Sequence, residues 1–66
     1  MKLETELLET LIGMSETDAY KLCKENGYDC RTTIEDGKPY IITCDLRFDR
    51  VNFEIENGLV TKANIG

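Results

Sequence analysis

Residues 42–52 read ITCDLRFDRVN, and the path taken by this stretch decides the fold. Its first half continues a β-rich run, while Val51 opens a second run of alternating apolar and polar residues. As plain structure, residues 40–43 would pair with a strand at 30–35 and give a four-stranded meander. As a functional feature, residues 40–49 would be a long exposed connection between two strands. The residues alone leave both interpretations open.

If residues 40–49 form an exposed loop, the loop must be held in place to resist digestion. The stretch places residues that peptidases readily cut directly before two arginines and a strand, so a flexible loop of this composition would be digested. A loop whose threonine and aspartate side chains are tied to an arginine on the strand beneath it would instead keep the shape of a substrate without being released. Residues 42–52 contain all three residue types.

A helix is predicted over about residues 15–26. Ser15 followed three residues later by Asp18 is typical of a helix N-cap with an acid in the first turn. The pair Asn26-Gly27 is a helix stop, because glycine adopts the left-handed conformation without strain. Apolar residues recur between these ends at helical spacing. They are Ala19, Leu22 and Cys23.

The segment before this helix is expected to contribute less. An apolar patch precedes the helix-breaking Gly13, and residues 1–7 are expected to be loosely ordered. The patch consists of Leu7, Leu8, Leu11 and Ile12.

Strands are predicted on both sides of the deciding stretch. Residues 28–35 alternate with period two, as in a half-buried strand, and residues 35–39 have turn chemistry. Residues 51–56 alternate again, and Asn57-Gly58 is a strong hairpin signal leading into residues 59–65. The predicted fold class is α+β, with one helix packed on a small sheet in a single domain of residues 1–66.

Length and charge exclude several classes of protein. A chain of 66 residues buries only about 60% of its unfolded surface, and its core supplies about 3–5 kcal/mol net, so a cofactor-binding fold has no room. The net charge is −5 with acids spread along the chain, which disfavours nucleic-acid binding. No window approaches 18 apolar residues, so no membrane span is predicted. Acids near the start argue against a secretory signal. The chain is therefore expected to be cytoplasmic, or secreted or periplasmic if a signal peptide was removed.

The side chains that usually carry chemistry are scarce. Cys23 and Cys30 could form a bridge or be two buried thiols, and buried thiols are the favoured interpretation. With no histidine and no Cys-x-x-Cys pair, no metal site is expected, and no nucleophile–base pair can be assembled, so the chain is not expected to be an enzyme. Arg31 and Lys24 are interpreted as solvated. The aromatic residues interpreted as core or core edge are Tyr20, Tyr28 and Phe53.

The motifs resemble those of the potato-inhibitor-I group of serine peptidase inhibitors (eglin and its relatives), and more closely the bacterial inhibitor family 78. The block at residues 43–52 carries the resemblance most specifically. Weaker matches lie at residues 11–19, at 36–39, at Asn57-Gly58 and at Gly66. The resemblance implies a helix on a small, twisted, mixed sheet with an exposed inhibitory loop.

The resemblance also implies a role for each matching residue. Cys44 would enter the specificity pocket of the peptidase, and Cys44–Asp45 would be the scissile bond. Thr43 and Asp45 would accept hydrogen bonds from Arg50 on the following strand. Arg47 would pack near the C-terminal end of the chain. The implied peptidase-binding loop consists of Ile42, Thr43, Cys44, Asp45, Leu46 and Arg47, and its implied support of Arg50, Asn52 and Gly66. Asn52 stands where eglin-like members carry a second strand arginine.

Two function classes follow. The first is a reversible, substrate-like inhibitor of serine peptidases, acting as a monomer without cofactor. The small apolar side chain of Cys44 favours subtilisin-like or chymotrypsin- and elastase-like enzymes, whereas lysine or arginine there would indicate trypsin-like targets. The second is a non-inhibitory protein-binding module on the same scaffold, whose loop binds a partner other than a peptidase or whose sheet edge recruits another strand. A separate alternative is that Cys44 is an ordinary strand residue.

Overall fold

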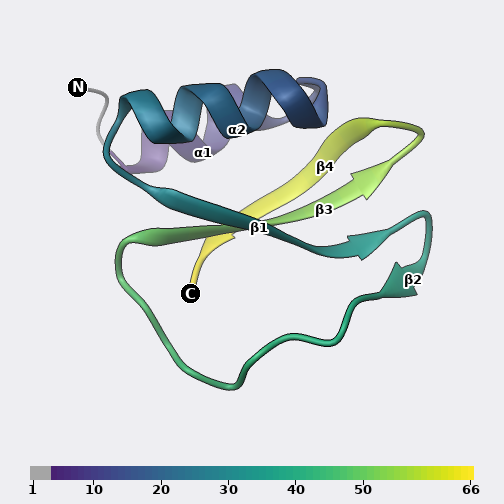
Figure 1. The fold of residues 1–66 in the computed structure, drawn as a ribbon. Coiled ribbons are helices and arrows are strands. Elements are labelled where there is room, and N and C mark those ends of the chain that lie inside the picture. The colour runs from purple at the N-terminus through teal and green to yellow at the C-terminus, as the bar shows by residue number, and fades with distance from the viewer. Residues whose placement is uncertain (1–3) are drawn as a thin grey trace.

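Two helices cover one face of a four-stranded sheet in the computed structural model, which describes residues 4–66 (Figure 1). The predicted α+β class is confirmed, but the described part of the chain has two helices where one was predicted. In chain order the elements are α1 (Glu4–Leu11), α2 (Glu16–Glu25), β1 (Asp29–Glu35), β2 (Lys38–Pro39), β3 (Arg50–Glu56) and β4 (Leu59–Ile65).

The unexpected helix α1 replaces part of the segment predicted to be loosely ordered. Residues 4–7 belong to this helix, while residues 1–3 lie outside the described part of the chain. Leu7 and Leu11 are one helical turn apart and fully buried, so they face the sheet together. A helix of 8 residues is marginal by itself, and packing of this apolar side supplies its stability.

Helix α2 forms where the capping residues predicted it. The Ser15 side chain accepts a hydrogen bond from the backbone N–H of Asp18 at 3.2 Å, which satisfies a free donor of the first turn. At the other end Gly27 adopts a φ of 81°, which glycine allows at little cost. The Lys24 side chain, predicted to be solvated, forms an exposed ion pair with Asp29 at 2.8 Å.

The sheet has the order β2-β1-β3-β4, and its central strands β1 and β3 are parallel. The other neighbours pair antiparallel, so the sheet is mixed. The meander interpretation is therefore wrong. Residues 40–43 form no strand, and only the two residues of β2 pair with β1 after the turn.

Both hairpins turn on a pair of residues with left-handed backbone. Asp36 and Gly37 connect β1 to β2 with φ of 51° and 78°, and Asn57 and Gly58 connect β3 to β4 with 52° and 78°. Two successive positive φ values match the right-handed twist of the flanking strands. The predicted turns are therefore confirmed at both places.

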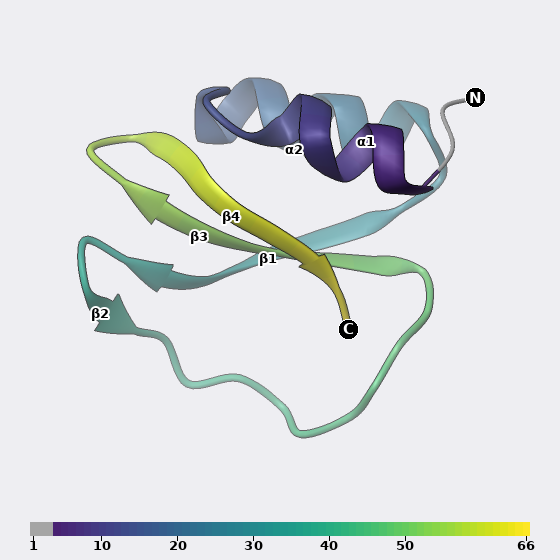
Figure 2. The ribbon, with the colours of Figure 1, turned by 180° about the vertical axis from the view of Figure 1, so that it is seen from behind.

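The core lies between the helices and the face of the sheet that they cover (Figure 2). Alternate residues of β3 point into it, and Phe53, fully buried, packs against the ring of Tyr20 at 5.4 Å between ring centres. Tyr28 packs at the edge, so the predicted core aromatics are confirmed. The buried apolar residues are Leu7, Leu11, Ala19, Cys23, Val51, Phe53, Ile55 and Val60.

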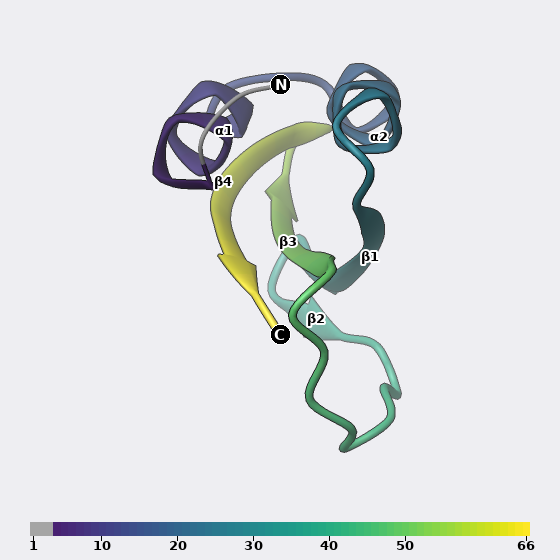
Figure 3. The same cartoon turned by 90° about the vertical axis from the view of Figure 1, so that its left-hand side faces the viewer.

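The parallel pairing explains why a long loop exists. Because β1 and β3 run in the same direction, the chain must return from the end of β1 to the level of its start before β3 begins. With 7 residues, β1 is roughly 20 Å long. No helix fills this crossover, so residues 40–49 make the return as an open loop. The loop hangs from the side of the sheet opposite the helices (Figure 3). Neither helix of the described chain is long and apolar enough to span a membrane.

Candidate functional site

The crossover loop exposes apolar side chains on both sides of the Cys44–Asp45 bond. After Tyr40, whose N–H donates to the Thr33 carbonyl at 2.9 Å, residues 41–47 have no strand structure. Ile41 is fully exposed and Phe48 is 83% exposed. The other large exposed apolar residues of the loop are Tyr40, Ile42 and Leu46. Cys44 is exposed as well. A partner that binds the loop would bury these side chains and remove them from water.

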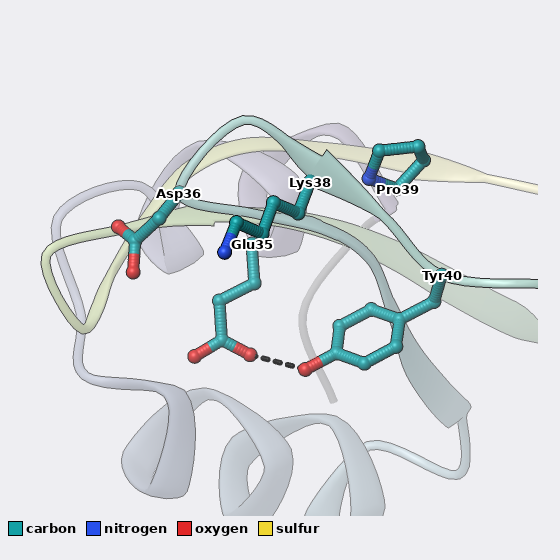
Figure 4. Close-up of a pocket in the computed structure, with 5 residues that line it drawn as sticks. All are labelled: Glu35, Asp36, Lys38, Pro39 and Tyr40. Atoms are coloured by element: carbon teal, nitrogen blue, oxygen red, sulfur yellow. Dashed lines mark hydrogen bonds between the residues drawn. The ribbon is translucent and has the colours of Figure 1, made fainter.

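The loop starts from a fixed point beside the β1–β2 turn (Figure 4). The Tyr40 hydroxyl donates to the Glu35 carboxylate, which raises the pKa of Tyr40. Tyr40 also borders an open pocket of about 310 Å³ on this turn, lined together with Glu35, Asp36, Lys38 and Pro39. The pocket lies at the turn and is not lined by Cys44 or Asp45. The Tyr40–Glu35 bond at its edge holds the start of the loop, and the pocket does not border the predicted scissile bond.

Arg50 at the start of β3 supports the loop on the Asp45 side. Its Nη2 donates to the backbone oxygen of Asp45 at 2.8 Å, and its Nη1 lies 3.4 Å from the carboxylate. The arginine is only 7% exposed, so its end of these hydrogen bonds is shielded from water, while the Asp45 side chain is 51% exposed. It thus fixes both the backbone and the side chain of Asp45.

Gly66 holds Arg50 in turn. The backbone oxygen of Gly66 accepts from Nε at 3.0 Å and from Nη2 at 2.8 Å, and the Gly66 N–H donates to the Arg50 carbonyl. A Cβ added to Gly66 would approach Asn52 Nδ2 to 3.0 Å and Leu46 Cδ1 to 3.7 Å. The close approach of these groups is the reason that glycine suits this position.

The support on the Thr43 side differs from the prediction. Arg50 was predicted to hold both Thr43 and Asp45, but the arginine that reaches Thr43 is Arg31 on β1, with Nη1 3.3 Å from the hydroxyl. The Thr43 hydroxyl also hydrogen-bonds the Asp45 carboxylate, across the Cys44–Asp45 bond. Arg31, predicted to be a solvated residue, is half-buried.

These contacts lower the pKa of the Asp45 carboxyl. The hydrogen bond from the Thr43 hydroxyl is the largest cause, and the charge of Arg50 adds to it. Asp45 is therefore ionised at neutral pH, as the contact with the Arg50 guanidinium requires.

Arg47 also lies elsewhere than predicted. Its Nε and Nη2 bind the two carboxylate oxygens of Asp49 at 2.9 Å each, and Nη2 also binds Asp29 at 2.6 Å. The prediction that Arg47 packs near the C-terminal end is wrong, since Leu46 is the loop residue beside Gly66. The hydrogen bond from Arg47 lowers the pKa of Asp49. The pKa of Asp29 is lowered first by its hydrogen bond from the Lys24 ammonium and then by that from Arg47. This exposed ion cluster ties the end of the loop to β1.

Asn52 supports the loop indirectly. Its Oδ1 accepts from Arg31 Nε at 2.7 Å, and its Nδ2 donates to Asn64 on β4 at 3.2 Å. The residue that stands in place of a second strand arginine thus contacts an arginine from the neighbouring strand. Sequence reasoning missed Arg31 and Asp29, because their partners are distant along the chain and only the strand register brings them together.

The three thiols are free. Cys23 is buried. Its burial is the larger cause, and the nearby Cys30 thiol the smaller one, that raise the pKa of Cys23 to about 11. Burial also raises the pKa of Cys30. The favoured interpretation of two buried thiols is confirmed for Cys23, whereas Cys30 is free but only half-buried. Within residues 4–66 no group of three potential metal-ligating His, Cys, Asp or Glu side chains comes together.

Comparison with protein-family models, with curated proteins and with solved structures finds no match for this chain.

Proposed function

We propose that this protein is a reversible, substrate-like inhibitor of serine peptidases. It would present Cys44–Asp45 to the peptidase as the scissile bond, here called the bait bond. The observation that carries the proposal is the belt of hydrogen bonds around this bond. Arg31 binds Thr43, Thr43 binds Asp45, and Asp45 binds Arg50. An exposed loop without such ties would be an ordinary substrate.

The belt favours binding because the loop is already ordered. Immobilising a side chain on association costs about 0.5–1.5 kcal/mol, and a preformed extended loop avoids much of this cost. The exposed apolar residues on both sides of the bond then add buried area without a large loss of entropy.

The same belt opposes release after cleavage. Arg50 holds the backbone oxygen of Asp45, so the newly formed amine stays next to the acyl group on Cys44. Reactants held in this way reach effective molarities on the order of 10⁵ M or more, which favours re-formation of the bond over attack by water. Hydrolysis is therefore slow and inhibition reversible.

The small exposed side chain of Cys44 points to the class of target. An apolar pocket of medium size, as in subtilisin-like or chymotrypsin- and elastase-like peptidases, accepts it, whereas a pocket with a carboxylate at its base favours lysine or arginine.

The test is titration of subtilisin and chymotrypsin with the purified protein, with mass spectrometry of the chain over time. We expect stoichiometric loss of peptidase activity while the chain stays intact or is slowly nicked between Cys44 and Asp45. Rapid cutting at this bond with full peptidase activity would reject the proposal and favour the non-inhibitory binding module.

A further inference from the structure

We infer that Arg31 is a positioning residue for the Thr43 side of the bait bond, held in place by a polar row across three strands. The inference rests on the proposed function, because it assigns a second supporting arginine to the same loop. It also makes a statement about the free protein that does not depend on any peptidase.

The polar row follows from the strand register. Arg31 on β1 pairs with Asn52 on β3, and Asn52 pairs with Asn64 on β4. The neighbours of Asn52 along β3, Val51 and Phe53, are fully buried in the core, so Asn52 lies on the opposite face of the sheet. The row thus lies on the face from which the loop hangs (Figure 3).

Hydrogen bonds along the row aim the guanidinium. Asn64 Oδ1 accepts from Asn52 Nδ2 at 3.2 Å, which leaves Asn52 Oδ1 facing Arg31. Arg31 Nε donates to this oxygen at 2.7 Å, and this bond fixes the plane of the guanidinium. Its Nη1 is then directed at the Thr43 hydroxyl, 3.3 Å away. A lysine has a single terminal nitrogen and lacks the fork that serves Asn52 and Thr43 at once.

A second row, two residues along the strands, supports the other side of the bond. Asp29 pairs with Arg50 in the register of β1 and β3, and Gly66 binds the Arg50 backbone and side chain. One arginine from each row therefore reaches the loop, Arg31 before the bait bond and Arg50 after it. When the bond is cut, Arg31 holds the new end at Cys44 against β1 and Arg50 holds the new end at Asp45 against β3, and the pairing of β1 with β3 keeps the two ends together.

The experiment compares Arg31→Ala and Arg31→Lys with the unchanged protein. Lys21→Ala, which removes one exposed charge on α2, is the matched control. The first readout is the rate of nicking at Cys44–Asp45 by subtilisin, together with the ratio of cut to intact chain at equilibrium. Loss of a hydrogen bond to a charged group changes an equilibrium constant about tenfold or more. We therefore expect the nicking rate and the ratio of cut to intact chain to rise roughly tenfold in Arg31→Ala and in Arg31→Lys. We expect no change in Lys21→Ala.

The second readout needs no peptidase and uses NMR relaxation of backbone amides in the free protein. We expect the order parameters of Thr43 and Cys44 to fall in both Arg31 variants, while that of Phe53 in the core stays at about 0.85. Unchanged order parameters at Thr43 in Arg31→Ala would overturn the inference, and so would an Arg31→Lys variant indistinguishable from the unchanged protein. If the unchanged protein inhibits no peptidase, the proposed function fails, but the relaxation data still decide the role of Arg31.

Discussion

The two faces of strand β3 are built in opposite ways. Val51, Phe53 and Ile55 point toward the helices and are almost completely buried among apolar side chains. Arg50 and Asn52 alternate with them on the other face, where Arg50 hydrogen-bonds Asp45 of the loop and Asn52 hydrogen-bonds Arg31. The apolar face of β3 therefore forms the core, and the polar face supports the loop.

The difference teaches that stability and loop shape can be changed separately in this chain. Apolar packing is non-directional, so the core face contributes mainly to the free energy of unfolding. Hydrogen bonds from arginine fix orientation, so the other face contributes mainly to the position of residues 43–45. Substitutions at neighbouring positions of one strand should then have different consequences.

Phe53→Ala should have the largest effect on stability. Removing a fully buried phenylalanine typically costs about 3–5 kcal/mol, which is comparable to the whole net stability expected of a chain of this size. Urea unfolding followed by circular dichroism should find the variant largely unfolded in water. The exposed Leu59→Ala on β4 is the control and should lose less than about 1 kcal/mol. A Phe53→Ala variant as stable as this control would mean that the core lies elsewhere.

Arg50→Ala should affect the loop more than the fold. The variant loses the bonds to Asp45 and to Gly66, and we expect the free energy of unfolding to fall by about 1.5–3 kcal/mol. Nicking by subtilisin between Cys44 and Asp45 should accelerate at least tenfold, and inhibition should become transient. Mass spectrometry of the reaction measures both. Lasting inhibition by a folded Arg50→Ala protein would contradict the proposed support.

Cys44→Arg should change the target with little change in stability. The side chain is exposed, and substitutions at such positions are usually within about 0.5 kcal/mol of neutral. Because a carboxylate at the base of the pocket selects arginine, inhibition of trypsin should appear while inhibition of subtilisin weakens. Equal inhibition profiles for both proteins would show that Cys44 does not enter the specificity pocket.

Acid should loosen the loop before it affects the core. The pKa of Asp45 is lowered in the folded protein, so the contribution of its carboxylate is complete above the ordinary value of 3.8 and is lost as the pH falls below that value. Carbon NMR of the Asp45 carboxyl should follow this titration, and the order parameter of the Thr43 amide should fall with it. Asp29 and Asp49 titrate in the same range, so Asp45→Asn is the control that isolates the Asp45 part. Titration of Asp45 at or above its ordinary value would contradict the contact with Arg50.

The sequence predicted the elements with strong local signals. The Ser15 cap, the stop at Gly27 and the Asn57-Gly58 turn depend on neighbouring residues alone, and each is found where it was predicted. Helix α1 was missed because its short apolar pattern gains stability only from packing against the rest of the fold.

The loop contacts were predictable in part. The resemblance placed Arg50 and Asp45 together, and they are only five residues apart along the chain. Arg31 was not predictable, because its contact with Asn52 depends on the parallel register of two strands that are 21 residues apart. A strand arginine by itself resembles any solvated charge. Arg47 was misplaced because nothing local indicated Asp29 as its partner.

Rigidity of residues 43–46 in the free protein can be measured directly by NMR relaxation of their backbone amides. If Arg31 and Arg50 hold the loop in one extended shape, the order parameters of these amides should approach those of β3, about 0.85, and should fall in Arg50→Ala. Values below about 0.6 in the unchanged protein would mean that the loop is flexible, and the bait conformation would then have no structural basis.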